Sequence, residues 1–417
     1  MKSREGTRLA GLGSSRPGAV LLLTGVLVLA LNLRAAITSL PPIFPELESA
    51  LHISAASLSL LAAIPVLCFG VFSGTSAPLS RRFGEERVLG AGLVLLAAGL
   101  VLRSLSPSLL LFPGTIVAGA AIALLNVLLP SLVKRRMPDR AGLVIGLYLL
   151  MLSLGAIVGS LTAVPIFNAA GGGTTAGSAS VRITLGLWAG PALLAAVLWL
   201  PQLRYRTRPE QGRLRRSGAL AMGRSRLAWQ VTLFMGLQSL SYYAALSWFP
   251  TMFRDRGVSA VHAGDLLALM NLGNGIMALL VPVLAHRAAD QRRLAAVATA
   301  ATAVGLAGAI FGPAGLAPGF VLLLGFGQGA SLGLGIFYTM ARAPDPVTAA
   351  SLSAFAQGVG YLIASAGPLA VGFLHDATGG WTVPGTILLC VAVFQLITGW
   401  LAGRARTVPA GLTPEAA

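Results

Sequence analysis

Charged side chains are scarce in this sequence: they occupy 10% of its 417 positions, while hydrophobic residues occupy 55%. A soluble domain carries about 25% charged residues, so water is not the main solvent of this chain. Apolar stretches of about 18 or more residues recur along the sequence, and each is long enough to cross a bilayer as a helix. The composition therefore predicts an all-α membrane protein.

Residues that carry chemistry are also few. The two cysteines, Cys68 and Cys390, lie in separate apolar segments, so we expect no disulfide framework. The only lysines, Lys2 and Lys134, are not in the Gly-Lys-Ser/Thr setting of a phosphate-binding loop. The four histidines are scattered, which argues against a catalytic or metal-binding cluster. We expect no ATP hydrolysis, no other enzymatic activity and no cofactor.

The apolar stretches predict twelve spanning helices. An apolar run from Ala19 to Leu31 follows several basic residues and could also be interpreted as a signal peptide. We reject cleavage because this segment has a counterpart in the second half of the chain. The predicted spans are 18–43, 56–79, 88–105, 109–133, 142–167, 182–200, 229–252, 262–285, 294–311, 319–341, 348–373 and 382–402.

The formal net charge of +17 would suggest a nucleic-acid partner if the basic residues formed one patch. They fall instead in alternate segments between spans, as the positive-inside rule describes. With a cytoplasmic N-terminus, all but five of the 30 basic residues lie inside. Arg34 lies within a span, and the four predicted outside are Arg103, Arg182, Arg254 and Arg256. We expect no nucleic-acid partner and a multi-pass protein, in the bacterial inner membrane, with both termini in the cytoplasm.

An internal repeat relates the two halves of the chain. Phe44-Pro45 recurs as Phe249-Pro250, an offset of 205 residues, and Leu79-Ser80-Arg81-Arg82 recurs at the same offset as Leu284-Ala285-His286-Arg287. Six spans then repeat in parallel orientation. The predicted halves are 1–201 and 229–417. The basic linker 202–228 is expected to contact anionic membrane lipids, and we expect a monomer.

Two six-helix halves joined by a basic central loop resemble the major facilitator superfamily. Four strings are similar to the cyanate and 2-nitroimidazole transporter family, and this resemblance covers essentially the whole chain. It implies the major facilitator fold and a secondary transporter. The strings are Asn32-Leu33-Arg34-Ala35-Ala36-Ile37, the segment from Gln238-Ser239 through Tyr242 to Trp248-Phe249-Pro250, Arg342-Ala343-Pro344-Asp345-Pro346, and Ala354-Phe355-Ala356-Gln357-Gly358-Val359-Gly360-Tyr361.

The superfamily's loop between spans two and three normally reads Gly-x-x-x-Asp-Arg-x-Gly-Arg-Arg, and this chain departs from it. Arg81 replaces the aspartate, and Glu85 and Glu86 replace the last two arginines. Only the Arg82 and Gly84 positions match, so the salt bridges usual for that loop cannot be carried over.

Arg34 is the sharpest candidate for substrate binding. An arginine within a span is costly and usually faces an aqueous cavity or a partner. All 13 Asp and Glu residues fall in tails, loops or predicted helix ends, so no acid within a span is available to Arg34. A planar guanidinium suits carboxylates and similar anions, which suggests that the substrate supplies the negative charge. Contact with backbone carbonyls, or extension toward the membrane surface, is the alternative.

Seven amides also lie within predicted spans, where lipid offers no hydrogen-bond partner. Some are expected to join helices and others to line the cavity. Asn32 and Gln238 are favoured as cavity residues, because the first helix of each half lines the cavity in the resembled superfamily. The seven amides are Asn32, Asn126, Gln238, Asn271, Asn274, Gln328 and Gln357.

Aromatic residues with a polar group could hold a flat or heteroaromatic ligand. Tyr148 and Tyr242 are the candidate tyrosines. Trp248 is either a further contact or an interfacial anchor, since it lies nearer the outer end of its span. The remaining tyrosines within spans are Tyr243, Tyr338 and Tyr361.

The sequence thus predicts a transporter of a small organic or inorganic anion, or of a small heteroaromatic compound, by alternating access. The membrane potential opposes anion entry, so accumulation would need a co-transported cation, with a proton as the candidate. Proton-coupled drug efflux would more naturally use an acid within a span. A receptor that does not transport is the other alternative, because fold alone does not prove turnover.

Overall fold

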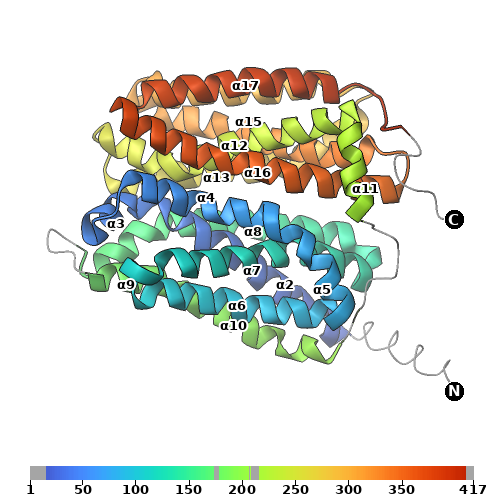
Figure 1. Cartoon of the computed structure of the whole chain (residues 1–417), viewed down its shortest axis with the longest axis horizontal. Helices are drawn as coiled ribbons and strands as arrows, with labels where there is room; N and C mark the ends of the chain where they lie inside the picture. The colour runs from blue at the N-terminus through green and yellow to red at the C-terminus, as the bar shows by residue number, and fades with distance from the viewer. Residues whose placement is uncertain (1–15, 173–177, 206, 208–215, 410–417) are drawn as a thin grey trace.

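The computed structural model describes residues 16–172, 178–205, 207 and 216–409, and within these ranges the secondary structure is entirely helical. Figure 1 shows two layers of helices, with the C-terminal helices above the N-terminal ones. The N-terminal layer contains α2 (Arg16–Thr38), α3 (Phe44–Leu51), α4 (Ala55–Phe72), α5 (Ser76–Phe83), α6 (Glu85–Leu105), α7 (Pro107–Arg136), α8 (Ala141–Ala169), α9 (Ser178–Leu187) and α10 (Ala189–Trp199). The C-terminal layer contains α11 (Arg216–Ala221), α12 (Arg226–Asp255), α13 (Ala260–Arg287), α14 (Arg292–Phe311), α15 (Ala317–Ala341), α16 (Pro346–Thr378) and α17 (Thr382–Ala402).

Eleven segments among the described residues are long and apolar enough to cross a membrane. The remaining predicted span corresponds to α12, whose 30 residues are also long enough to cross. Gln230, Gln238 and several serines make α12 more polar than its neighbours. The predicted all-α fold with twelve spanning helices is therefore confirmed.

Three predicted spans end early or are interrupted in the structure, and proline or glycine accounts for two of them. The first ends at Thr38 instead of residue 43, because Pro41 and Pro42 cannot donate to a continuing helix and form η1 (Pro41–Ile43) instead. The second ends at Phe72, before a short 3-10 turn and α5. The sixth is interrupted at Trp188, just before Gly190-Pro191, and so consists of α9 and α10.

The helix ends define two faces of the molecule. We call the end where α4, α7, α10 and α17 finish the linker face, because the segment joining the two layers lies there. We call the opposite end, which carries η1 and α3, the far face. In Figure 1 the linker face is on the right, with α5 and α11, and the far face is on the left, with α3 and α9.

Glycine allows the helices to approach closely. A Cβ added at Gly155 of α8 would lie 2.1 Å from the Leu31 carbonyl oxygen of α2, and one at Gly159 would lie 2.8 Å from that of Ala35. The small size of these two residues therefore lets α8 and α2 pack closely. Gly146 of the same helix differs, because nothing lies within 4 Å of a Cβ added there. Between the layers, α4 packs against α16 and α8 against α13.

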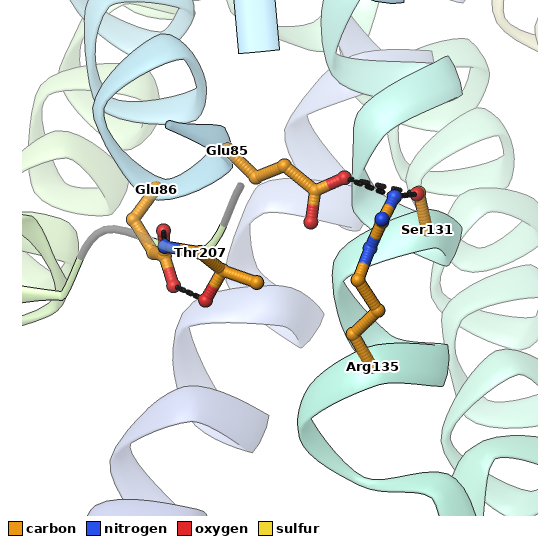
Figure 2. A network of polar contacts seen from close by, with 5 residues as sticks. All are labelled: Glu85, Glu86, Ser131, Arg135 and Thr207. Atoms are coloured by element: carbon orange, nitrogen blue, oxygen red, sulfur yellow. Dashed lines mark hydrogen bonds and ion pairs between the residues drawn. The ribbon is translucent and has the colours of Figure 1, made fainter. Parts of the chain in front are cut away.

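The departure from the superfamily's loop pattern has a structural counterpart on the linker face (Figure 2). Glu85, at the start of α6, accepts from Ser131 at 2.9 Å and from Arg135 at 2.7 Å, both on α7. Glu86 accepts from the backbone N–H of Thr207 at 2.7 Å and from its hydroxyl. These two acids therefore join α6 to α7 and to the start of the linker, all within the N-terminal layer.

Candidate substrate site

Arg34 lies near the end of α2 and is half-buried. Its Nη1 donates to the Tyr242 hydroxyl of α12 at 3.4 Å. Its guanidinium carbon is 5.6 Å from the Tyr242 ring centre and 6.0 Å from that of Tyr243. No described carboxylate forms an ion pair with it. The cation is thus held by a hydroxyl and by aromatic faces.

The last turn of α2 fixes the position of Arg34. The Thr38 hydroxyl lies 3.1 Å from the Arg34 carbonyl oxygen and 3.0 Å from the Ala156 carbonyl oxygen of α8. The glycines of α8 let the two backbones approach at this level. Arg34 is therefore positioned by its own layer, while its side chain reaches the other layer.

Tyr242 connects Arg34 to the C-terminal layer. Its hydroxyl accepts from Arg34 and donates to the Asn271 Oδ1 of α13 at 2.8 Å. Asn271 in turn donates from Nδ2 to the Leu267 carbonyl at 2.9 Å. This chain of hydrogen bonds runs from α2 through α12 to α13, and so crosses between the two layers.

Further aromatic rings surround this connection. Tyr243 packs edge-on against Tyr242, with ring centres 5.1 Å apart. Phe69 of α4 lies 6.4 Å from Tyr243 and packs edge-on against Tyr361 of α16 at 5.3 Å. Tyr361 and Tyr148 are also electrostatic neighbours of Arg34. Sequence reasoning missed Phe69, because a phenylalanine within an apolar span gives no signal of function.

Tyr148 and Asn126 form a second polar pair in the N-terminal layer. The Tyr148 hydroxyl of α8 donates to Asn126 Oδ1 of α7 at 2.7 Å. Tyr148 is buried and Asn126 is half-buried. Since Tyr148 neighbours Arg34, this pair extends the polar cluster to α7.

Three candidate amides lie deeper in the C-terminal layer. Gln238 donates to the Gln328 backbone carbonyl at 3.3 Å. The Gln328 side chain is fully buried, and neither of its polar atoms has a partner among the described residues. Asn274 Nδ2 is likewise buried without a described partner. Gln238 and Asn274 lie about one helical turn from Tyr242 and Asn271, so they continue the polar track away from Arg34.

The structure does not bring three other candidates to Arg34. Asn32 donates to Val28 within α2 at 3.2 Å, and two residues correspond to about 200° around a helix, so Asn32 and Arg34 lie on nearly opposite sides. Gln357 bonds Ser353 within α16 at 2.8 Å. Trp248 donates to the Pro368 carbonyl at 2.9 Å and packs against Phe44 near the far face.

The far face carries an ion pair between the layers. Arg254 Nη1, at the end of α12, lies 2.8 Å from the Glu46 carboxylate of α3 and 3.4 Å from the Pro42 carbonyl. Among the described residues, the other ion pairs each lie within one layer.

Arg103 lies in a different environment from the predicted one. The charge distribution predicts it on the outer side, near the end of the predicted span 88–105. The structure instead places it in α6 with 2% of its surface exposed, and Nη1 donates to the Ala36 carbonyl at 3.3 Å. The nearby break at Ser106 sends α7 back alongside α6, and this packing encloses the side chain.

The chain is similar in sequence to two known transporters over most of its length. The chain is 40% identical to the 2-nitroimidazole transporter of Escherichia coli (strain K12), across 93% of the chain and 97% of that protein. It is 30% identical to the cyanate transport protein CynX of the same organism, across 90% of the chain and 96% of that protein.

A solved structure supports the fold at lower identity. A bacterial homologue of the human lysosomal transporter Spinster, in an inward-facing and unoccupied conformation, superposes with a TM-score of 0.76 at 15% identity. The match covers 94% of this chain and 98% of that one. The sequence profile of the Major Facilitator Superfamily matches residues 23–368. Together with the twelve helices, these findings show that the chain belongs to the major facilitator superfamily.

Proposed function

We propose that this protein is a secondary transporter of a small organic or inorganic anion, or of a small heteroaromatic compound. Alternating access would take place between the halves 1–201 and 229–417. The observation that carries the proposal is Arg34, a permanent cation inside the helix bundle whose described partners are a hydroxyl and aromatic rings.

The electrostatics favour an anionic or electron-rich ligand. Arginine does not lose its proton in proteins, so its charge must be solvated by water, protein oxygens or substrate. The Arg34 guanidinium has five N–H groups. The described residues accept a hydrogen bond from one of them. An arriving anion gains a charge-assisted and planar contact with the remaining donors.

The aromatic surroundings favour a flat ligand. Phe69, Tyr243 and Tyr361 come from both layers and lie around the Arg34–Tyr242 contact. Such rings offer faces for stacking, and the tyrosines add polar groups. The two relatives, one a 2-nitroimidazole transporter and one a cyanate transport protein, suggest a small flat or anionic substrate.

The mechanism we propose uses the link between the layers. When substrate binds Arg34, it competes with the Tyr242 hydroxyl for the guanidinium N–H groups. This competition weakens the Arg34–Tyr242 contact between the two halves. A membrane potential that is negative inside opposes anion entry by about 2.3 kcal/mol per charge per 100 mV. Uptake against that potential would therefore use a co-transported cation, and we propose a proton.

Binding to the purified protein tests the site. The probes are cyanate and 2-nitroimidazole, measured by thermal shift and by equilibrium binding. We expect Arg34→Gln to weaken binding about 10- to 100-fold, because it loses a charged hydrogen-bond donor. Arg34→Lys keeps the charge without the planar fork and should weaken binding less. Tyr242→Phe should cost a few-fold, while Tyr338→Phe is the matched control because its hydroxyl has no described partner.

Parent-like binding and uptake into proteoliposomes by both Arg34 variants would refute the proposed site. Binding without uptake by the parent protein would instead indicate a receptor.

The proposed orientation, with both termini and the linker face in the cytoplasm, has its own test. Ala289 and Ala314 are exposed and lie at opposite ends of α14, on the linker face and the far face. In a Cys390→Ser background, an impermeant thiol reagent should label Ala314→Cys in intact cells. Ala289→Cys should react only after permeabilisation, and the reverse pattern would invert the orientation.

A further inference from the structure

Arg103 is a second buried arginine that the proposed transport site does not use. Only one of its three nitrogen atoms, Nη1, has a described acceptor, the Ala36 carbonyl oxygen. Nε and Nη2 are buried and have no described partner. None of the described ion pairs involves Arg103. A guanidinium with 2% exposure is therefore left largely unpaired.

The contact through Nη1 has a structural reason. The Ala36 carbonyl would normally accept from the Leu40 N–H, but that N–H bonds the Ile37 carbonyl instead. The helix cannot continue beyond this point because Pro41 follows. Arg103 thus caps the C-terminal end of α2, where a positive charge also interacts favourably with the helix dipole.

The cap leaves the other edge of the guanidinium unused. Nε and Nη2 carry parallel N–H groups on one edge, and this edge binds anions with two hydrogen bonds. Burying such a cation without a partner is strongly unfavourable, and arginine cannot escape the penalty by losing its proton. Buried polar groups of this kind call for an ordered water or an ion.

We propose that the Nε and Nη2 edge of Arg103 is a binding site for a small monovalent inorganic anion of halide size. Low exposure limits the size of the ligand, because α7 packs tightly against this part of α6. A Cβ added at Gly114 of α7 would lie 2.4 Å from the Arg103 backbone nitrogen. Because the unpaired guanidinium is positively charged, the ligand must be an anion.

This site is separate from the one at Arg34. Ala36 is two residues after Arg34, which places the two contacts about 200° apart around α2. Arg34 reaches the C-terminal layer, whereas Arg103 contacts α2 from within the N-terminal layer. Arg103 caps the helix that carries Arg34, so an anion that fixes the Arg103 side chain would also hold this cap in place.

Chloride binding to the purified full chain tests the proposal. Radioactive chloride is titrated at constant ionic strength with gluconate as the replacing anion, and thermal unfolding is followed in the same buffers. We expect saturable chloride binding and a higher Tm in chloride than in gluconate. Arg103→Gln should abolish both effects, and Arg103→Lys should weaken binding at least tenfold because lysine lacks the two-donor edge.

Two matched variants separate this site from the transport site. Arg34→Gln and Arg182→Gln should keep the chloride effect, since Arg182 is an exposed arginine that bonds the Ser104 carbonyl next to Arg103. If Arg34→Gln abolishes chloride binding while Arg103→Gln retains it, the halide binds at the transport site. The present proposal is then wrong and the proposed function stands.

Crystals of the unaltered protein grown in bromide keep the test decisive if the Arg103 variants do not fold. A bromide anomalous peak about 3.3 Å from Nε and Nη2 supports the site. A water molecule at that position, or equal Tm values in chloride and gluconate, overturns it.

Discussion

Neutralising Glu46 should favour opening of the far face. Glu46 and Arg254 form the ion pair that crosses between the layers, with 2.8 Å between the charged atoms. The two side chains are 18% and 23% exposed, so water screens them only in part. Every conformation that separates α3 from the end of α12 must break this contact. Glu46→Gln should therefore shift the equilibrium toward such conformations.

The size of the shift follows from the geometry. The bare attraction at 2.8 Å is on the order of 6 kcal/mol for an effective dielectric constant of 20, before desolvation is subtracted. Desolvation and screening reduce the net contribution of a partly exposed pair to about 1–2 kcal/mol. Because 1.4 kcal/mol is a factor of ten, the open population should rise about 5- to 30-fold.

Ser247 provides the reporter for this shift. It is 3% exposed and lines a small cavity beneath η1, together with Pro41 and Phe44. In a Cys390→Ser background, the alkylation rate of Ser247→Cys is measured in detergent with and without Glu46→Gln. We expect Glu46→Gln to raise the alkylation rate about 5- to 30-fold, as the open population does.

The neighbouring exposed acid gives the control. Glu48→Gln removes a charge two residues away that has no described partner, and the rate should not change. The double variant Glu46→Arg and Arg254→Glu exchanges the two charges. It should bring the alkylation rate part of the way back to that of the parent. An unchanged rate in Glu46→Gln would show that the ion pair does not hold the far face closed.

Three further predictions concern packing, helix capping and the linker. Gly155→Ala should destabilise the protein by about 1–3 kcal/mol because its Cβ meets α2, whereas Gly146→Ala should be neutral or stabilising by about 0.5–1 kcal/mol; Tm in detergent distinguishes them. Hydrogen bonds from the side chain and backbone of Thr348 lower the pKa of Asp345, the N-cap of α16. Asp345→Ala should thus lower Tm at neutral pH, and the difference should vanish as pH falls through the lowered pKa. Thr207→Val removes the hydroxyl contact with Glu86 and should speed tryptic cleavage of the linker several-fold; an unchanged rate would show that this contact does not hold the linker.

Much of the fold could be predicted because membrane helices are specified by length and hydropathy. Lipid offers no hydrogen bonds, so each crossing must satisfy its own backbone, and twelve apolar stretches imply twelve helices. Hydropathy does not fix the residues at which the helices begin and end. Proline explains the early end of α2, and Gly190-Pro191 follows the interruption at Trp188. The end of the second span at Phe72 has no such signal in the sequence.

The transport site could be predicted only in part. Arg34 stands out because cations within spans are rare. Tyr242 was a candidate for a different reason, since an aromatic ring with a hydroxyl can contact a flat ligand. Asn32 does not adjoin Arg34, since spacing by two residues already places it on the other side of α2. The positions of Phe69 and Arg103 became clear only from the structure. In the sequence, Phe69 resembles a lipid-facing residue of an apolar span, and Arg103 resembles a charge at the membrane surface.

The interior polar groups differ between the two layers, and the difference bears on coupling. The N-terminal layer contributes two interior cations, Arg34 and Arg103, whereas the C-terminal layer contributes neutral amides such as Asn271, Asn274 and Gln328. A neutral amide cannot take up a proton near neutral pH, and no acid among the described residues lies in the middle of a span. A proton that crosses with the substrate must therefore travel on the substrate itself or on water, which favours substrates that are weak acids. In the proposed site, the fixed positive charge would bind the ionised form of the substrate, while the amides could donate to or accept from either form.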